Sequence, residues 1–195
     1  QMGEEEEKQE YMKIVSSNNE LLLQLIDDIL DLSKIEAGTM EFTFAPTDIN
    51  ELMEGICRQM QEKNTSPDVA ITFTEKATEC IFHTDRVRLS QVIINFTNNA
   101  MKFTSEGSIQ MGYRIDETKD EIYFYVKDTG IGIPADKIDE VFERFVKLNT
   151  FAKGTGLGLA ICRVIVERLE GTIGANSREG EGSCFWFRLP MHQKV

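Results

Sequence analysis

The sequence predicts an α+β fold, a mixed β-sheet with helices on one face, preceded by one long helix that belongs in a bundle. Three observations favour this fold. Apolar side chains within residues 1–38 recur with the period of a helix. The middle of the chain alternates strand-like runs with amphipathic helices. The late strand-like runs are separated by turns short enough for antiparallel pairs.

Composition narrows the class of protein before any motif is considered. At 195 residues the chain exceeds one typical domain, and we expect two units, residues 1–38 and residues 39–195. The net charge of −12 argues against a nucleic-acid partner, because phosphate contacts need a surplus of Lys and Arg. Four scattered cysteines form no C-x-x-C pair, as expected of reduced thiols in the cytosol. No apolar run approaches the length of a membrane span.

Residues 4–36 are predicted to form the long helix. Their apolar stripe is wider than the seam of a strict coiled coil, which has two apolar positions in each heptad. A helix with such a stripe is not stable alone. It needs either a bundle, most simply of four helices, or the core of its own domain. The bundle is favoured because the apolar stripe runs the whole length of the helix. Gly38 is the residue at which we expect the helix to end. The stripe comprises Ile14, Val15, Leu21, Leu22, Leu25, Ile26, Ile29, Leu32 and Ile35.

The later helices are predicted from their caps and apolar faces. Asp48 or Asn50 caps a helix that ends near Lys63, and Asp85 caps the next one. The apolar face of that second helix includes Leu89, Val92, Ile93 and Phe96. A short helix over residues 135–142, a flexible stretch over residues 143–155 and a helix over residues 156–169 follow.

Strands are predicted where apolar and polar side chains alternate between turn residues. A polar turn joins the second strand to the third, and a charged turn over residues 116–120 joins the next pair. The last two strands form a hairpin about Gly180 and Gly182. The predicted strands span residues 40–45, 69–73, 80–83, 109–115, 122–126, 172–176 and 183–189.

Three polar side chains share one face of the helix that Asp85 begins. Asn95, Asn99 and Lys102 stand at positions i, i+4 and i+7. An amide oxygen is a hard, neutral ligand suited to Mg²⁺, which also takes phosphate oxygens, and a lysine one turn on can neutralise phosphate charge. From this helix alone, an exposed polar face is the simpler interpretation.

Asp128 follows the strand over residues 122–126, and Gly130 and Gly132 come directly after it. A carboxylate at the end of a buried strand needs a partner, and the amino group of adenine is a suitable donor. The two glycines allow the backbone to approach a ligand closely. An ordinary turn after a strand is the alternative.

A glycine-rich loop, Gly154-Thr155-Gly156-Leu157-Gly158, opens the last helix. Backbone N–H groups and the dipole at a helix N-terminus bind anions. The loop has no Lys followed by Ser or Thr, so it is not a P-loop, and it does not follow the first strand as a Rossmann fingerprint would.

In order and spacing, these segments resemble the catalytic ATP-binding domain of bacterial sensor histidine kinases, in the superfamily that includes gyrase, Hsp90 and MutL. The run of residues 85–104 looks like the N box of that family, and residues 128–132 look like its first glycine box. Residues 142–145 look like its F box, and residues 154–159 look like its second glycine box. The resemblance covers roughly residues 48–190.

The resemblance implies a Bergerat-type α/β sandwich that binds ATP and Mg²⁺. Asn99, with Asn95, would hold Mg²⁺ against the phosphates, Lys102 would contact phosphate, and Phe103 would pack beside the nucleotide. Asp128 would accept a hydrogen bond from the adenine amino group. Residues 143–155 would form the ATP lid, in which Lys147 stands where the family often has an Arg, without its bidentate geometry.

Position 95 favours a kinase over a hydrolase or a chaperone. The ATPases of the superfamily carry a Glu there to activate water, whereas the Asn95 amide takes no proton at neutral pH. Two other hypotheses stay open: a non-catalytic nucleotide-binding module of a degenerate kinase, and an anti-sigma-type serine kinase. The serine kinase would not explain the leading helix.

The chain has only His83 and His192, and neither is followed by an acidic residue on a helix, as the family's phosphoacceptor histidine is. We therefore expect a fragment whose first helix resembles the second helix of the dimerisation hairpin. In the parent we expect a homodimer through that helix and a response-regulator receiver domain as partner. We also expect a cytoplasmic domain of a protein anchored in the bacterial inner membrane.

Overall fold

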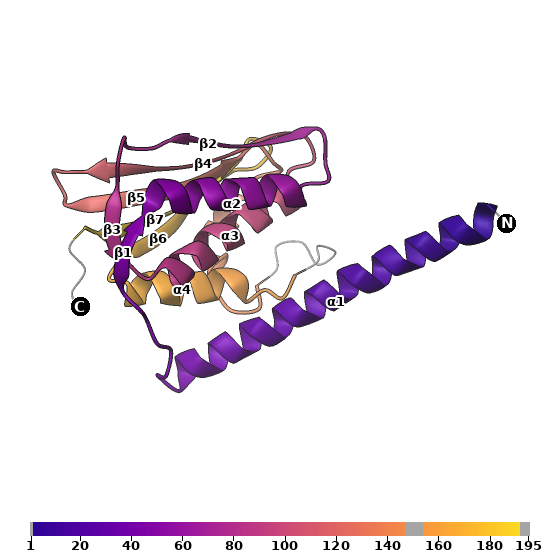
Figure 1. The fold of residues 1–195 in the computed structure, drawn as a ribbon, viewed down its shortest axis with the longest axis horizontal. Helices are drawn as coiled ribbons and strands as arrows, with labels where there is room; N and C mark the ends of the chain where they lie inside the picture. The colour runs from indigo at the N-terminus through magenta and orange to yellow at the C-terminus, as the bar shows by residue number, and fades with distance from the viewer. Residues whose placement is uncertain (1, 147–153, 192–195) are drawn as a thin grey trace.

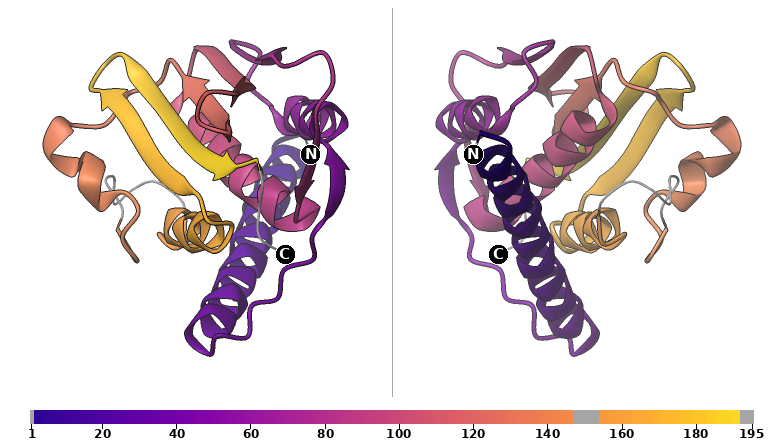
Figure 2. Two further views of the ribbon diagram at one scale, coloured as in Figure 1. Left: turned by 90° about the vertical axis from the view of Figure 1, so that its left-hand side faces the viewer. Right: turned by 90° about the vertical axis from the view of Figure 1, so that its right-hand side faces the viewer.

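The computed structural model describes residues 2–146 and 154–191, and it has the predicted α+β architecture. A five-stranded sheet forms one layer, three helices cover one of its faces, and the long helix α1 (Met2–Glu36) runs along the far side of those helices (Figure 1). The side views in Figure 2 show the same order of layers. No helix within the described ranges combines the length and the hydropathy needed to cross a membrane.

The large sheet is mixed, as predicted, although the long-range pair within it was not predicted. The strand order is β2-β4-β5-β7-β6, in which β2 runs parallel to β4 and the other neighbours are antiparallel. The two late hairpins, β4 with β5 and β6 with β7, are therefore confirmed. The strands are β2 (Val69–Glu75), β4 (Gly107–Asp116), β5 (Glu121–Asp128), β6 (Thr172–Arg178) and β7 (Gly182–Pro190).

Side-chain caps set the starts of two of the covering helices, as predicted. The Asp48 side chain accepts from the backbone N–H of Glu51 at 3.1 Å and begins α2 (Ile49–Lys63). The Asp85 side chain accepts from Arg88 N–H at 2.9 Å and begins α3 (Arg86–Phe103). These bonds satisfy donors that a helix start leaves without an intrahelical partner.

The core lies between the sheet and α2, α3 and α4 (Gly158–Arg168). Phe96 of α3 is fully buried, and its ring lies 5.4 Å from that of Phe185 and 6.0 Å from that of Phe187 on β7. Phe187 in turn stacks on Phe124 of β5 at 4.8 Å. These aromatic contacts fix α3, and the polar face it carries, against the centre of the sheet.

Helix α1 ends where the sequence predicts. Gly38 adopts a φ of +67°, and the N–H of Thr39 donates to the carbonyl of Lys34 at 2.9 Å, the pattern of a glycine C-cap. Near this end Leu32 and Ile35 pack against the core. Farther toward the N-terminus Ile14, Val15 and most other apolar residues of the stripe are exposed.

Two strand predictions were wrong. Residues 40–44 form no strand, and the first strand begins later than predicted, at β1 (Ala45–Asp48). Phe42 and Phe44 do pack against the core, but the N–H of Thr43 donates to the Asp85 carboxylate at 2.7 Å instead of to a strand. The predicted strands 69–73 and 80–83 exist but do not pair with each other: β3 (Ile81–Thr84) pairs with β1 in a separate sheet.

Two helix boundaries also differ from the prediction. The short helix is a 3₁₀ helix, Ala135–Glu140. The last helix begins at Gly158 and not at Gly156, whose φ of +74° is incompatible with a right-handed helix.

Candidate functional site

The polar face of α3 carries Asn95 and Asn99 next to each other. The Nδ2 of Asn99 donates to the Oδ1 of Asn95 at 3.2 Å, and both side chains are half-buried. Because Asn99 donates through its amide nitrogen, its Oδ1 stays available as an acceptor. A neutral amide oxygen beside a phosphate is a donor set that suits Mg²⁺. In the part of the chain that the structure describes, no cluster of three His, Cys, Asp or Glu offers a metal site.

The start of α4 lies directly against this amide pair. A Cβ atom added to Gly158 would overlap the Nδ2 of Asn95. With the Asn95 side chain in this position, only a glycine allows the first turn of α4 to come this close to it. The free N–H groups of a helix start are therefore next to the proposed metal-binding face.

The last turn of α3 brings Lys102 to the glycine-rich loop. Its Nζ lies 4.8 Å from the centre of the Phe103 ring, and a Cβ on Gly154 would lie 3.0 Å from the same nitrogen. A cation is thereby placed beside the loop that precedes α4, where it can balance the charge of an anion.

Asp128 is the last residue of β5 and is only 4% exposed. Its Oδ1 accepts from Gly130 N–H at 2.8 Å and from Ser183 N–H at 3.2 Å. Burial raises the pKa of the Asp128 carboxyl, and these two backbone donors partly offset that rise. Both hydrogen bonds end on Oδ1, so Oδ2 is the oxygen available to a ligand donor.

The first glycine segment is confined between α3 and the β6–β7 hairpin. A Cβ on Gly130 would overlap the carbonyl of Phe103, which accepts from Ile131 N–H at 3.2 Å. Gly132 has a φ of +69° and lies against the carbonyl of Arg178. The end of β5 is thus held at the end of α3.

Sequence reasoning missed Thr104 at this junction. Its Oγ1 is buried, lies where a Cβ on Gly130 would reach it at 2.8 Å, and has no hydrogen-bond partner among the described residues. A buried hydroxyl without a partner carries a cost unless a ligand or water satisfies it. Its position at the end of the run of residues 85–104 was the only signal in the sequence.

Thr155 organises the loop before α4. Its Oγ1 accepts from Leu157 N–H at 3.2 Å, and the hydroxyl donates to the Oδ2 of Asp28 on α1 at 2.5 Å. The carbonyl of Gly156 accepts from Phe145 N–H at 2.8 Å, which ties the F-box segment to the same loop. Sequence reasoning missed Asp28 because nothing local relates it to residue 155.

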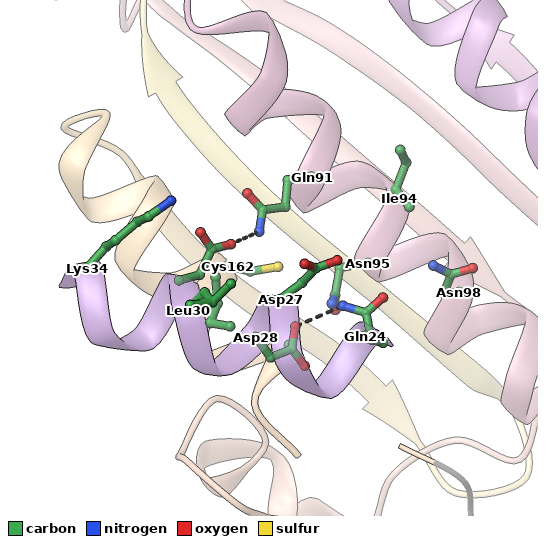
Figure 3. A pocket seen from close by; sticks show the side chains of 13 residues that line it. Gln24, Asp27, Asp28, Leu30, Lys34, Gln91, Ile94, Asn95, Asn98 and Cys162 are labelled. Atoms are coloured by element: carbon green, nitrogen blue, oxygen red, sulfur yellow. Dashed lines mark hydrogen bonds between the residues drawn. The ribbon is translucent and has the colours of Figure 1, made fainter. Parts of the chain in front are cut away.

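A cleft of about 370 Å³ lies between α1, α3 and α4 (Figure 3). Asn95 and Gly158 line it, but Asp128 does not. The cleft therefore adjoins the amide pair from the side of α1 and is separate from the proposed adenine position. Its other lining residues include Gln24, Asp27, Asp28, Asp31, Lys34 and Gln91.

Several predicted site residues thus come together from distant segments: the amide pair, Lys102 with Phe103, Asp128 with its glycines, and the loop from Gly154 to Gly158. Lys147 lies outside the described residues, as does His192. His83 is on β3, with its ring 6.2 Å from that of Phe44.

Residues 84–193 match the family described as histidine kinase-, DNA gyrase B-, and HSP90-like ATPase. The chain is 35% identical over 206 residues to hybrid signal transduction histidine kinase K of Dictyostelium discoideum, covering 96% of this chain and 17% of that protein. It is 36% identical over 192 residues to circadian input-output histidine kinase CikA of Synechococcus elongatus, covering 95% of this chain and 25% of that protein. Over 183 residues it is 34% identical to sensor histidine kinase RcsC of Escherichia coli, covering 91% and 19%. The chain therefore spans a quarter or less of these relatives.

Two solved structures are similar over nearly the whole chain. Full-length ShkA in complex with AMPPNP has a TM-score of 0.83 at 28% identity, covering 97% of this chain and 40% of that chain. Histidine kinase ThkA in complex with the response regulator protein TrrA has a TM-score of 0.73 at 26% identity, covering 93% and 51%.

Proposed function

Because the chain belongs to the family of histidine kinase-, DNA gyrase B- and HSP90-like ATPases and carries the catalytic ATP-binding domain of a sensor histidine kinase, we propose that it binds ATP with Mg²⁺ and transfers the γ-phosphoryl group to a histidine. That histidine belongs to another part of the parent protein and passes the phosphoryl group to an aspartate of a response regulator. The observation that carries the proposal is the approach of Gly158, at the start of α4, to the Asn95–Asn99 pair, while Gly130, just after Asp128, lies against the end of the same helix α3.

Each site residue has a proposed task that its chemistry supports. The available Oδ2 of Asp128 accepts a hydrogen bond from the adenine amino group, and Phe103 packs beside the nucleotide. Asn99, with Asn95, holds Mg²⁺ through amide oxygen. When bound, the ion would neutralise charge on the phosphate oxygens.

The phosphates are proposed to lie against the glycine-rich loop and the first turn of α4. Backbone N–H groups and the helix dipole favour an anion there, and Lys102 adds a positive charge at Gly154. Lys147, in the proposed lid, would add a second charge.

Asn95 supports phosphoryl transfer over hydrolysis. Its amide oxygen takes no proton near neutral pH, so this position offers no general base to activate water. A histidine acceptor is already nucleophilic, and the protein then needs to position the reactants and stabilise charge. The half-buried amide can do both.

The similar complex with TrrA supports a response-regulator receiver domain as a partner of the parent protein. The exposed apolar stripe of α1 supports a homodimer through that helix. The resemblance to sensor histidine kinases leads us to propose a parent anchored in the membrane, with this domain in the cytoplasm.

Transfer in trans tests the proposal. The purified chain is mixed with labelled ATP, Mg²⁺ and a separate helical hairpin that bears a histidine followed by an acidic residue. Acid-labile label on that histidine is expected, and its loss in the Asp128→Asn variant links transfer to the site. Nucleotide binding without any labelled histidine would favour the alternative, a non-catalytic nucleotide-binding module of a degenerate kinase.

A further inference from the structure

A carboxylate of α1 contacts the glycine-rich loop. Asp28 is 4% exposed; its Oδ2 accepts from the Thr155 hydroxyl at 2.5 Å, and its Oδ1 accepts from Gln24 Nε2 at 2.8 Å. Both partners are neutral, and within the described ranges no Lys, Arg or His forms an ion pair with Asp28. A buried negative charge thus lies at the loop without a paired cation among those residues.

The contact places this charge at an anion-favouring position. Thr155 precedes Gly158, the first residue of α4, by three positions, and its Oγ1 also accepts from the N–H of Leu157. The N-terminus of a helix stabilises a nearby negative charge. The electrostatic effect of Asp28 extends into the first turns of α4. Burial raises the pKa of the Cys162 thiol there, and the negative charge of Asp28 raises that pKa further.

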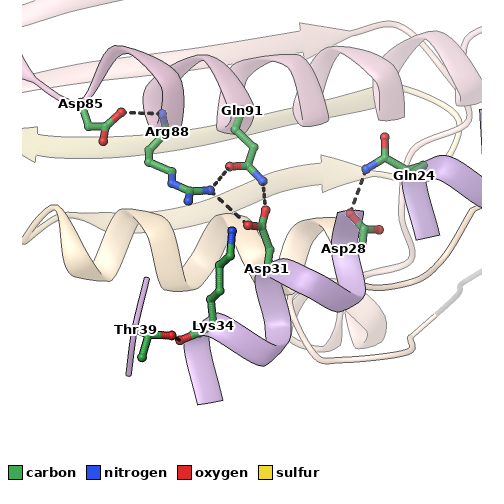
Figure 4. A network of polar contacts seen from close by, with 8 residues as sticks. All are labelled: Gln24, Asp28, Asp31, Lys34, Thr39, Asp85, Arg88 and Gln91. Carbon is green, nitrogen blue, oxygen red and sulfur yellow. Dashed lines mark hydrogen bonds and ion pairs between the residues drawn. The ribbon is translucent and has the colours of Figure 1, made fainter. Parts of the chain in front are cut away.

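Beside the apolar packing of Leu32 and Ile35, polar contacts join α1 to the catalytic domain (Figure 4). Asp31 accepts from Gln91 at 2.6 Å and pairs with Arg88 at 3.3 Å, and Glu36 pairs with Arg144 at 2.7 Å. The cleft of about 370 Å³ separates these contacts from the amide pair. The Glu36–Arg144 pair, whose side chains are 60% and 45% exposed, contributes little stability, so this end of the interface can open.

We propose that Asp28 competes with the nucleotide phosphates for the glycine-rich loop, so that docking of α1 and binding of nucleotide weaken each other. The carboxylate holds the Thr155 hydroxyl and occupies part of the favourable potential at the start of α4. A triphosphate brought to the same loop meets a like charge at short range. Coupling between two binding events is reciprocal, so bound nucleotide also loosens α1. This inference rests on the proposed ATP site.

Nucleotide titration of the 195-residue chain tests the competition. The Asp28→Asn variant keeps the size of the side chain and removes its charge, and Asp28→Ala removes the hydrogen bonds as well. Both are expected to bind Mg²⁺-ADP roughly threefold to tenfold more tightly than the wild type in calorimetry. Glu20→Gln is the matched control, because Glu20 is an exposed carboxylate on the same helix that does not line the cleft. Its affinity is expected to change by less than about twofold.

Hydrogen exchange gives the reciprocal measurement. Saturating Mg²⁺-ADP is expected to speed amide exchange in residues 20–36 of the wild-type chain, and to have a much smaller effect in Asp28→Asn. Weaker or unchanged binding by both Asp28 variants would overturn the competition, as would exchange in residues 20–36 that slows on binding. If the wild-type chain bound no nucleotide at all, the proposed function would fail and this inference with it.

Discussion

The amide of Asn95 on α3 occupies the space that any side chain at Gly158 on α4 would fill. This contact joins the proposed metal-binding face to the proposed phosphate-binding helix start. The obstructing atom is the end of a flexible side chain and not backbone, so a larger residue at 158 displaces Asn95 without blocking the fold.

Gly158→Ala is therefore expected to damage binding more than stability. With the Asn95 amide displaced, Mg²⁺-nucleotide affinity should fall roughly tenfold, the effect of about one hydrogen bond. Calorimetry with and without Mg²⁺ measures the change. Gly55→Ala is the control, because Gly55 is exposed on α2 and has nothing near its missing Cβ. That change should raise the free energy of unfolding by about 0.5–1 kcal/mol and leave binding unaltered. Wild-type binding by Gly158→Ala would count against the role of Asn95.

Asp128→Asn is expected to remove most of the nucleotide affinity. An amide can still accept the Gly130 and Ser183 N–H groups through its oxygen, but it then turns an NH₂ group toward the adenine amino group. Two buried donors facing each other cost about 2–3 kcal/mol, or roughly 30- to 150-fold in affinity. Asp116→Asn serves as the control, because Asp116 lies at the other end of the β4–β5 hairpin from Asp128. Equal affinity of Asp128→Asn and wild type in calorimetry would refute the adenine role.

The same substitution should stabilise the unliganded protein at neutral pH. Since burial raises the pKa of Asp128, the folded state binds a proton more tightly than the unfolded state does. This tighter binding of the proton to Asp128 stabilises the folded state fully below the ordinary pKa of 3.8. The stabilisation is lost as the pH rises through the raised pKa. The thermal midpoint of Asp128→Asn should therefore exceed that of the wild type at pH 7, by a margin that shrinks toward pH 3.5. A margin independent of pH would exclude this explanation.

The sequence predicted local features of the fold better than long-range pairing. The caps at Asp48, Asp85 and Gly38 are local hydrogen-bond patterns, and all three are in place. The prediction of a strand over residues 40–45 was wrong. Alternation of apolar and polar residues indicates which side chains are buried, but it does not indicate which groups the backbone hydrogen-bonds to. The partner of β2 is β4, beyond α3 in the chain, and no turn residue near β2 indicates that pairing.

For the candidate site, spacing along single elements indicated which residues share a face, as the bond between Asn95 and Asn99 shows. It could not reveal contacts made only in the folded chain. The bond from Thr155 to Asp28 joins residues 127 positions apart, and the approach of Gly158 to Asn95 depends on how two helices pack. The ligand roles of the predicted residues stay predictions.

Asn99 is expected to matter mainly when Mg²⁺ is present. Asn99→Ala removes the amide oxygen that we propose as a ligand and should weaken Mg²⁺-nucleotide binding about tenfold, with a smaller effect in EDTA. Asn98→Ala is a matched control, because the adjacent amide accepts from Lys63 of α2 at 3.3 Å and not from Asn95. Asn99→Ala effects of the same size with and without metal would remove the ligand assignment.

The exposed stripe of α1 should drive self-association of the chain. Val15, Leu22, Ile26 and Ile29 recur at heptad-like spacing on one side of α1 and are 45% to 58% exposed. A second copy that buried them would gain about 1.5–3 kcal/mol per side chain. Leu22→Glu places a charge on this stripe in both copies, so the dimer dissociation constant should rise by at least about a hundredfold in analytical ultracentrifugation.

Ser16→Glu controls for that experiment, since it adds the same charge to an exposed position of α1 off the stripe. It should dimerise like the wild type, because a charge that stays in water is not desolvated by the second helix. Nucleotide affinity should be unchanged in both variants, since the contacts of α1 with the glycine-rich loop and α3 are made by Asp28 and Asp31. A wild-type chain that stays monomeric at high protein concentration, or a Leu22→Glu dimer of undiminished affinity, would show that the stripe serves another contact.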